Sequence, residues 1–200
     1  ENGGTVRLSG IIDRLDKYEG YVRVVDYKTG SRNFKLPDIL FGQNMQMLIY
    51  LYAVCKAAQG ESAPAGILYM PALHKNGDAA SKHRMNGLLL EDEHVLKAMD
   101  IMQTGEFVPK PTGRTAENFI SDSDFLKIFA LIERKLKSAG ERIYEVKIAA
   151  NPTDGIDSGA CKYCEFKGIC RIDEKEIKKV PNMPAEEVFE KMGEVSENEV

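Results

Sequence analysis

The sequence predicts an α/β fold in which an antiparallel hairpin is flanked by helices. Two apolar runs rich in β-branched residues, Leu8–Tyr18 and Tyr21–Lys28, are separated by Glu19-Gly20, a pair suited to a two-residue turn. Apolar residues at helical spacing then run from Pro37 to about Gln59. A short apolar run, Pro64–Met70, fits a buried strand beside the hairpin. At 200 residues, the chain can bury one sizeable core.

The hairpin turn fixes which side chains share a face. If Tyr18 and Tyr21 flank the turn, Asp16 lies opposite Arg23, and Asp13 lies opposite Asp26. Side chains of a strand alternate between the two faces. One face is therefore expected to carry the following residues: Ile11, Asp13, Leu15, Val22, Val24, Asp26 and Lys28.

Two carboxylates on an apolar face need an explanation, because opposed like charges destabilise a strand pair and desolvation adds a further cost. A divalent cation between Asp13 and Asp26 removes both costs, since Mg²⁺ prefers oxygen ligands. Lys28 would then lie beside the metal, where it could orient a water or neutralise a phosphate. The alternatives are a solvated face with unrelated charges, or a register shifted by a β-bulge.

The helix expected from Pro37 to about Gln59 places two polar side chains together. Pro37 suits a first helical turn, and Gly60 suits the helix end. Gln46 and Tyr50 are four residues apart, so they lie on one face of the helix. The alternative is that Tyr50 is a core aromatic and Gln46 an incidental polar residue.

The remainder of the chain is less informative. Residues from Pro71 to Asn86 are expected to form a loop whose His74 and His83 are interpreted as solvated. A short helix is expected around Glu91–Gln103. Ser121 or Ser123 can cap a long helix that ends near Ile148. The segment 172–200 is charged and is expected to be a flexible tail.

Three cysteines lie close together in the sequence at Cys161, Cys164 and Cys170. Thiolates at this spacing can converge on one metal centre, but zinc and iron–sulfur clusters both normally need four ligands. A disulfide framework is not expected, because nothing in the sequence indicates secretion. Cys55 lies within an apolar helical stripe and is expected to be a small buried hydrophobe. One ligand is therefore missing from this sequence.

These motifs resemble a known family. The strings Gly10-Ile-Ile-Asp-Arg-Leu-Asp16 and Val24-Val-Asp-Tyr-Lys-Thr-Gly30 resemble the RecB-like branch of the PD-(D/E)xK nuclease superfamily, and Gln46-x-x-x-Tyr50 matches its helix motif. Together with the Cys161–Cys170 cluster, they look like the nuclease domain of AddB-type subunits of bacterial AddAB (RexAB-like) helicase–nucleases. The resemblance implies a restriction-endonuclease-like core with a mixed central sheet. It covers most of the chain up to Arg171, so a nuclease domain is expected over residues 1–171.

The resemblance also implies roles for single residues. Asp13, Asp26 and the backbone carbonyl of Tyr27 would hold Mg²⁺ or Mn²⁺, and Lys28 would act at the phosphate or the attacking water. Gln46 and Tyr50 would brace the lysine or contact the DNA backbone. The family carries a 4Fe–4S cluster, to which Cys161, Cys164 and Cys170 would contribute. Its fourth cysteine and a further acidic residue would precede Glu1, so cluster and activity are expected to be incomplete in this piece.

The implied function is metal-dependent hydrolysis of DNA, one single strand at a time, during double-strand-break processing beside an AddA-type helicase–nuclease subunit. A stand-alone nuclease of the Cas4 kind would use the same residues. A non-catalytic module that guides DNA or docks a subunit is the alternative from a different class.

Composition limits the remaining classes. The formal net charge of −4 does not favour a free-standing nucleic-acid binder, although a larger complex could supply the positive channel. No signal peptide or membrane-spanning run is evident, so a cytoplasmic protein is expected. The start lacks methionine and lies almost inside a strand, which suggests an excised fragment.

Overall fold

One mixed sheet organises the computed structural model, which describes residues 4–30, 33–72, 83–147, 149–154, 159–172 and 177–194. The sheet order is β1-β2-β3-β4-β5. The strands are β1 (Arg14–Tyr18), β2 (Tyr21–Lys28), β3 (Ala63–Pro71), β4 (Asn86–Leu90) and β5 (Phe119–Ile120). The pairs β1–β2 and β3–β4 are antiparallel, and the pairs β2–β3 and β4–β5 are parallel. The predicted hairpin and mixed sheet are confirmed, whereas the sequence patterns did not predict β4 and β5.

The hairpin has the predicted register. Tyr18 pairs with Tyr21, and Asp16 pairs with Arg23. Glu19 and Gly20 both have positive φ, at 45° and 84°, which is the geometry of a type I′ turn that matches strand twist. The ladder stops at the Arg14–Val25 pair, one step short of the expected opposition of Asp13 and Asp26.

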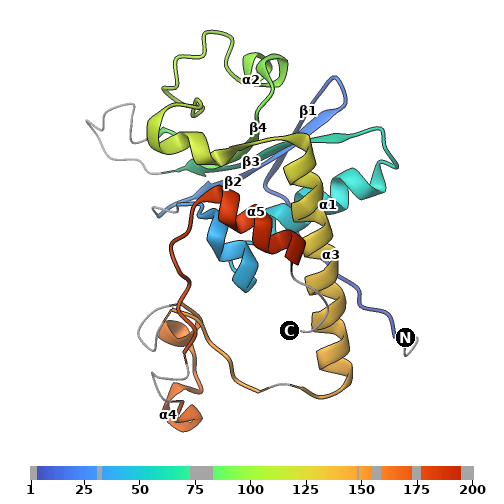
Figure 1. The fold of residues 1–200 in the computed structure, drawn as a ribbon, viewed down its shortest axis with the longest axis vertical. Coiled ribbons are helices and arrows are strands. Elements are labelled where there is room, and N and C mark those ends of the chain that lie inside the picture. Colours follow the sequence, from blue (N-terminus) through green and yellow to red (C-terminus); the bar gives the residue numbers. More distant parts are fainter. Residues whose placement is uncertain are drawn as a thin grey trace.

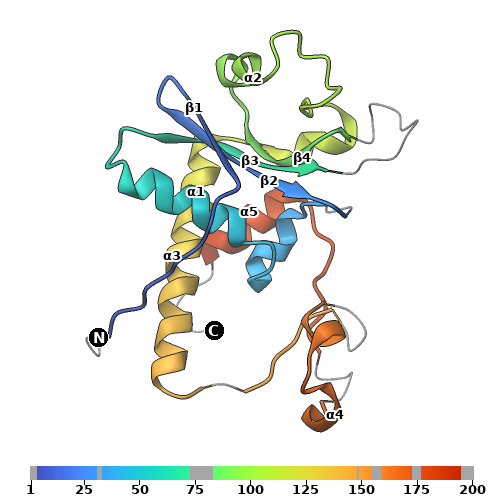
Figure 2. The same ribbon diagram turned by 180° about the vertical axis from the view of Figure 1, so that it is seen from behind.

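The chain bends at Asp13, and this bend overturns one prediction. Ile11 is 85% exposed, whereas Ile12 packs against the core. The alternation of a strand therefore does not extend upstream of β1. Residues before the bend instead cross helix α1 and continue beside helix α3 (Figure 2).

The helical segment expected as one unit is two. A 3₁₀ helix, η1 (Leu36–Phe41), is followed by α1 (Gln46–Ala57). Between them, Gly42 and Asn44 have φ of 76° and 53°. Left-handed residues cannot continue a right-handed helix, so α1 begins at Gln46.

Helices cover both faces of the sheet (Figure 1). On one face lie α1, α3 (Asp122–Tyr144) and α5 (Ala185–Glu194), around a core that includes Leu48, Leu51 and Phe125. On the other face, α2 (Glu93–Met99) lies over a smaller apolar cluster. Ser121 caps α3 by accepting a hydrogen bond from the backbone N–H of Asp124, as the sequence predicts.

The C-terminal segment is not the flexible tail that was expected, at least over residues 177–194. The side chains of Val188 and Met192 on α5 are buried in the main core. Arg134 Nη2 of α3 also donates a 2.7 Å hydrogen bond to the carbonyl of Met192. The apolar side of α5 was hidden in the sequence by its many charges, which lie mainly on the exposed side of the helix.

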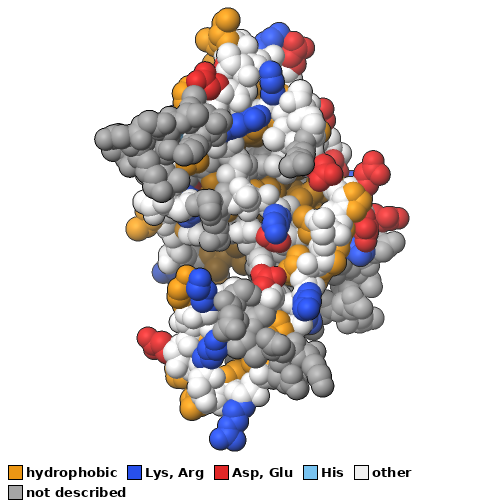
Figure 3. All heavy atoms as spheres, turned by 90° about the vertical axis from the view of Figure 1, so that its left-hand side faces the viewer, with side chains coloured by type: hydrophobic (Ala, Val, Ile, Leu, Met, Phe, Trp, Pro, Cys, Tyr) orange, Lys and Arg blue, Asp and Glu red, His pale blue; other side chains and the backbone are white. Residues whose placement is uncertain are grey.

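A small lobe containing η4 (Gly159–Tyr163) and α4 (Lys167–Cys170) stands apart from the sheet (Figure 1). On the face drawn in Figure 3, acidic and basic side chains are interspersed over the described residues. In the described part of the chain, no helix has the length and apolar character needed to span a bilayer. His74 and Ile148 lie outside the described residues.

Candidate active site at the end of β2

The end of β2 brings a carboxylate and an ammonium group together. Asp26 and Lys28 are two residues apart, so both side chains lie on the face of Val22 and Val24, which pack into the main core. Lys28 Nζ is 2.6 Å from Asp26 Oδ2. The Asp26 side chain is 13% exposed, and that of Lys28 is 31% exposed. The ion pair therefore faces an opening rather than a closed interior.

Asp13 reaches the same end of the hairpin from the neighbouring chain segment. Its Oδ2 accepts a 3.1 Å hydrogen bond from the backbone N–H of Tyr27. This bond replaces the ladder pair that was expected between Asp13 and Asp26. It holds the Asp13 carboxylate beside the residue that follows Asp26.

The donor set fits a hard divalent cation. The Oδ2 atom of Asp26 is buried and accepts no hydrogen bond from any described residue, because the contact with Lys28 lacks hydrogen-bond geometry. A buried carboxylate oxygen of this kind is costly unless a cation or another donor satisfies it. The Asp13 and Asp26 carboxylates and the Tyr27 carbonyl would supply the oxygen ligands that Mg²⁺ or Mn²⁺ takes.

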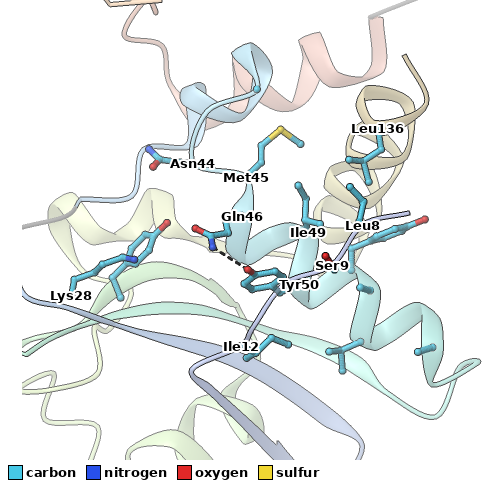
Figure 4. A pocket seen from close by; sticks show the side chains of 17 residues that line it. Leu8, Ser9, Ile12, Lys28, Asn44, Met45, Gln46, Ile49, Tyr50 and Leu136 are labelled. Carbon is cyan, nitrogen blue, oxygen red and sulfur yellow. Dashed lines mark hydrogen bonds between the residues drawn. The ribbon is translucent and has the colours of Figure 1, made fainter. Parts of the chain in front are cut away.

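Gln46 and Tyr50 share one face of α1, as predicted. Gln46 Nε2 donates a 3.0 Å hydrogen bond to Tyr50 Oη (Figure 4). Both residues line the same pocket as Lys28. Among the described residues, however, no hydrogen bond joins either side chain to Lys28, so a bracing contact on the lysine is not part of this geometry.

The aromatic ring beside Lys28 is Tyr69 of β3, which no sequence motif singled out. Lys28 Nζ lies 5.9 Å from the centroid of the Tyr69 ring. Tyr69 pairs with Asp26 across the parallel strands and is 4% exposed. A tyrosine in the predicted buried strand Pro64–Met70 was the available signal, but the register of β2 against β3 was needed to use it.

Gly10 is a second residue whose importance comes from contact. A Cβ atom at this position would lie 2.5 Å from Tyr50 Cε1 and 2.6 Å from Tyr50 Oη. Such separations are far below van der Waals contact, so a side chain here would displace the tyrosine ring. Glycine therefore lets residues 8–12 cross α1 directly over Tyr50.

The cysteines do not converge as predicted. Cys161 is partly exposed, and Cys164 and Cys170 are exposed. Within the described ranges, no three His, Cys, Asp or Glu side chains are grouped closely enough to hold a metal ion. The residues present therefore do not fit a complete iron–sulfur site. Cys55 is buried as expected, and burial raises the pKa of its thiol to about 11.

Comparison with known proteins agrees with this geometry. The family model of the PD-(D/E)XK nuclease superfamily matches residues 1–171. The chain belongs to the PD-(D/E)XK nuclease superfamily. The predicted superfamily is thus confirmed, and members of this superfamily generally use a divalent metal.

Curated relatives of this superfamily member share one name, which describes one of the subunits of an ATP-dependent helicase/deoxyribonuclease. The protein from Bacillus pumilus is 32% identical over 87% of this chain and 17% of its own length. The protein from Clostridioides difficile is 30% identical over 96% of the chain and 20% of its own length. That from Alkaliphilus metalliredigens is 28% identical over the whole chain and 20% of its own length. The chain thus spans about a fifth of the length of these relatives.

Proposed function

We propose that this chain is the nuclease domain of an ATP-dependent helicase–nuclease and hydrolyses phosphodiester bonds of single-stranded DNA during double-strand-break processing. The observation that carries the proposal is the Asp26–Lys28 pair, 2.6 Å apart at the end of β2, with Asp13 anchored beside it. The match of the superfamily to residues 1–171 and the names of the relatives support it. The shared name of the relatives favours a helicase–nuclease subunit over a stand-alone nuclease.

In the proposed mechanism, Asp13, Asp26 and the Tyr27 carbonyl would hold Mg²⁺ or Mn²⁺. A bound divalent metal polarises the scissile phosphate and promotes ionisation of a water. Lys28 Nζ positions the attacking water or stabilises the charge that develops on the phosphate oxygens. The water oxygen bonds to phosphorus as the bond to the leaving sugar oxygen breaks. Gln46 and Tyr50 hold the DNA backbone in the adjoining pocket.

Further parts of the proposal concern the larger protein. By the names of the relatives, an AddA-type subunit would be the partner in a heterodimer, and the protein would act in the cytoplasm. Cys161, Cys164 and Cys170 would join a fourth ligand from elsewhere in the longer chain to hold a 4Fe–4S cluster. No catalytic step depends on that cluster.

The test is strand-specific cleavage by the full-length protein assembled with its partner subunit. Each DNA strand is labelled separately, and cleavage is measured with Mg²⁺, with Mn²⁺ and with EDTA. We expect EDTA to abolish cutting of one strand, and Lys28→Ala to reduce it by at least about a hundredfold. Lys17→Ala, at an exposed lysine of β1 in the same hairpin, is the matched control and should cut normally.

Unchanged cleavage of both strands by the Lys28→Ala assembly would contradict the catalytic role of this site. The alternative of a non-catalytic DNA-guiding or subunit-docking module would then take its place. Parallel measurement of assembly and thermal unfolding separates a catalytic loss from a structural one.

A further inference from the structure

A groove leads away from the proposed catalytic residues along α1. Its volume is about 820 Å³, within the range of about 300 to 1,000 Å³ that is typical of small-molecule sites. Lys28, Gln46 and Tyr50 line one end, and Ala57 and Leu136 line the other. Figure 4 shows Lys28 on one side of Gln46 and Tyr50, and Leu8 and Leu136 on the other. The groove is therefore continuous with the site and extends beyond it.

The two ends of the groove differ in chemistry. Lys28 is the single acidic or basic residue among the described lining residues, and it lies at the catalytic end. Beyond Tyr50 the walls are mainly aliphatic, from Ile12, Ile49, Ala53 and Leu136. A ligand that matches this lining carries an anionic group at one end and a largely apolar, uncharged body next to it.

A nucleotide has this distribution of charge, with a phosphate attached through a sugar to a flat base. We propose that the groove holds the bases of the nucleotides that flank the scissile phosphate on one side of a single DNA strand. This inference rests on the proposed function, because the phosphate is placed by Asp13, Asp26 and Lys28. It adds a subsite for bases, a feature that neither the sequence patterns nor the superfamily match assigns.

The groove also determines what kind of strand can enter. Its roof is the segment 8–12, which crosses α1, and its floor includes Tyr50 directly below Gly10. A base that occupies this space must be unstacked from its neighbours and unpaired, which a duplex allows only at a cost of base flipping. Aliphatic and aromatic walls accept any base, and the few polar side chains in the lining offer little base readout. Binding is therefore expected to be tolerant of sequence.

The first experiment narrows the groove without touching the proposed catalytic residues. Ala53 is exposed and lines the middle of the groove, so Ala53→Phe should fold normally and fill the space. Ala130→Phe is the matched control, because Ala130 is also exposed on a helix but does not line the groove. In the full-length assembly, we expect Ala53→Phe to raise KM for a single strand by about tenfold while kcat stays within about twofold. Ala130→Phe should change neither constant.

The second experiment uses the wild-type protein and moves the change into the DNA. Single strands carrying one abasic nucleotide at successive positions are compared for KM. A rise confined to one or two positions on one side of the cut supports the base subsite, whereas a flat profile overturns it. If Ala53→Phe impairs assembly or lowers the unfolding temperature with KM unchanged, the groove holds polypeptide, and the proposal is also overturned.

The outcomes separate this inference from the proposed function. If wild-type protein cuts DNA and Lys28→Ala does not, the proposed function stands whatever the groove variants do. If neither groove filling nor abasic substitution changes KM in that cutting-competent protein, the base subsite alone is wrong. If metal-dependent cutting never occurs, the proposed function fails first.

Discussion

At the residue scale, Tyr69 is the buried aromatic against which the proposed catalytic lysine lies. Its ring is 4% exposed, pairs with Asp26 across the strands, and lies 5.9 Å from Lys28 Nζ. An ammonium group within about 6 Å of an aromatic centroid is attracted by the ring quadrupole. Tyr69 is therefore interpreted as a positioning residue that orients Lys28 through its ring face.

Replacing the ring should affect turnover more than replacing the hydroxyl. We expect Tyr69→Leu to lower kcat by roughly fivefold, since a cation–π contact is worth about 1 kcal/mol. Tyr69→Phe keeps the ring and should retain kcat within about twofold. The assay is single-strand cleavage, run below the unfolding temperature of both variants. Equal losses in the two variants would show that the ring face does not orient Lys28.

Gly10 offers a second residue-scale prediction. Because a Cβ atom would lie 2.5 Å from Tyr50 Cε1, Gly10→Ala should displace the ring and break its 3.0 Å bond with Gln46. We expect cleavage to fall by roughly fivefold, the equivalent of about 1 kcal/mol for one lost hydrogen bond. Gly193→Ala is the control, since nothing lies within 4 Å of a Cβ atom there.

A double-mutant cycle tests the cause of the Gly10 effect. If the alanine acts by moving the tyrosine, Gly10→Ala should have no further effect on cleavage in a Tyr50→Ala background. Additive losses would instead mean that Gly10 acts through the chain path of residues 8–12 and not through Tyr50.

At the element scale, the hairpin is held together by a shared carboxylate. Asp16 accepts 2.8 Å hydrogen bonds from Arg14 Nε and Arg23 Nε. Burial raises the pKa of Asp16, but the bonds from Arg14 and Arg23 outweigh it, so the pKa is lower than usual for an aspartate. A lowered pKa in the folded state means that this stabilisation is present above the ordinary aspartate range and is lost as pH falls through the lowered value.

The pH dependence of Asp16 can be measured by substitution. We expect Asp16→Asn to reduce the free energy of unfolding at neutral pH, with the difference from wild type shrinking in acid. Urea unfolding of both proteins across the acidic range is the measurement. Because Asp16 and its partners are partly exposed, the difference at neutral pH should be modest. A difference that is constant with pH would contradict a role for the charge of Asp16.

At the scale of the whole molecule, the C-terminal helix α5 closes the main core. Val188 is fully buried, and α5 lies against α3 through the bond from Arg134 to Met192. Residues 177–194 are therefore part of the folded unit, although the superfamily match ends at residue 171.

This packing predicts a clear difference within α5. Val188→Ala should lower the free energy of unfolding by about 2 kcal/mol, from lost burial and the cavity that remains. Glu190→Ala, at an exposed position of the same helix, should change it by less than about 0.5 kcal/mol. Chemical denaturation gives both values. Equal stability of the two variants would mean that α5 is not docked in solution.

The sequence by itself determined the local parts of this protein. Period-two alternation and the Glu19-Gly20 turn specify the hairpin register, and four-residue spacing puts Gln46 and Tyr50 on one helix face. These features depend on neighbours in the chain, so patterns of turn chemistry and hydrophobicity are sufficient. The grouping of Asp26 with Lys28 follows from the same local rule.

The tertiary structure decided the features that depend on distant contacts. The bend at Asp13 exposes Ile11, and Gly42 with Asn44 divides the helix that periodicity made continuous. Tyr69 reaches Lys28 through the pairing of β2 with β3, and α5 is buried by α3 and η1. Short apolar runs and charged helices are ambiguous in sequence, because burial against a remote surface outweighs local preference. The groove beside Tyr50 likewise exists because segment 8–12 crosses α1, which no local pattern encodes.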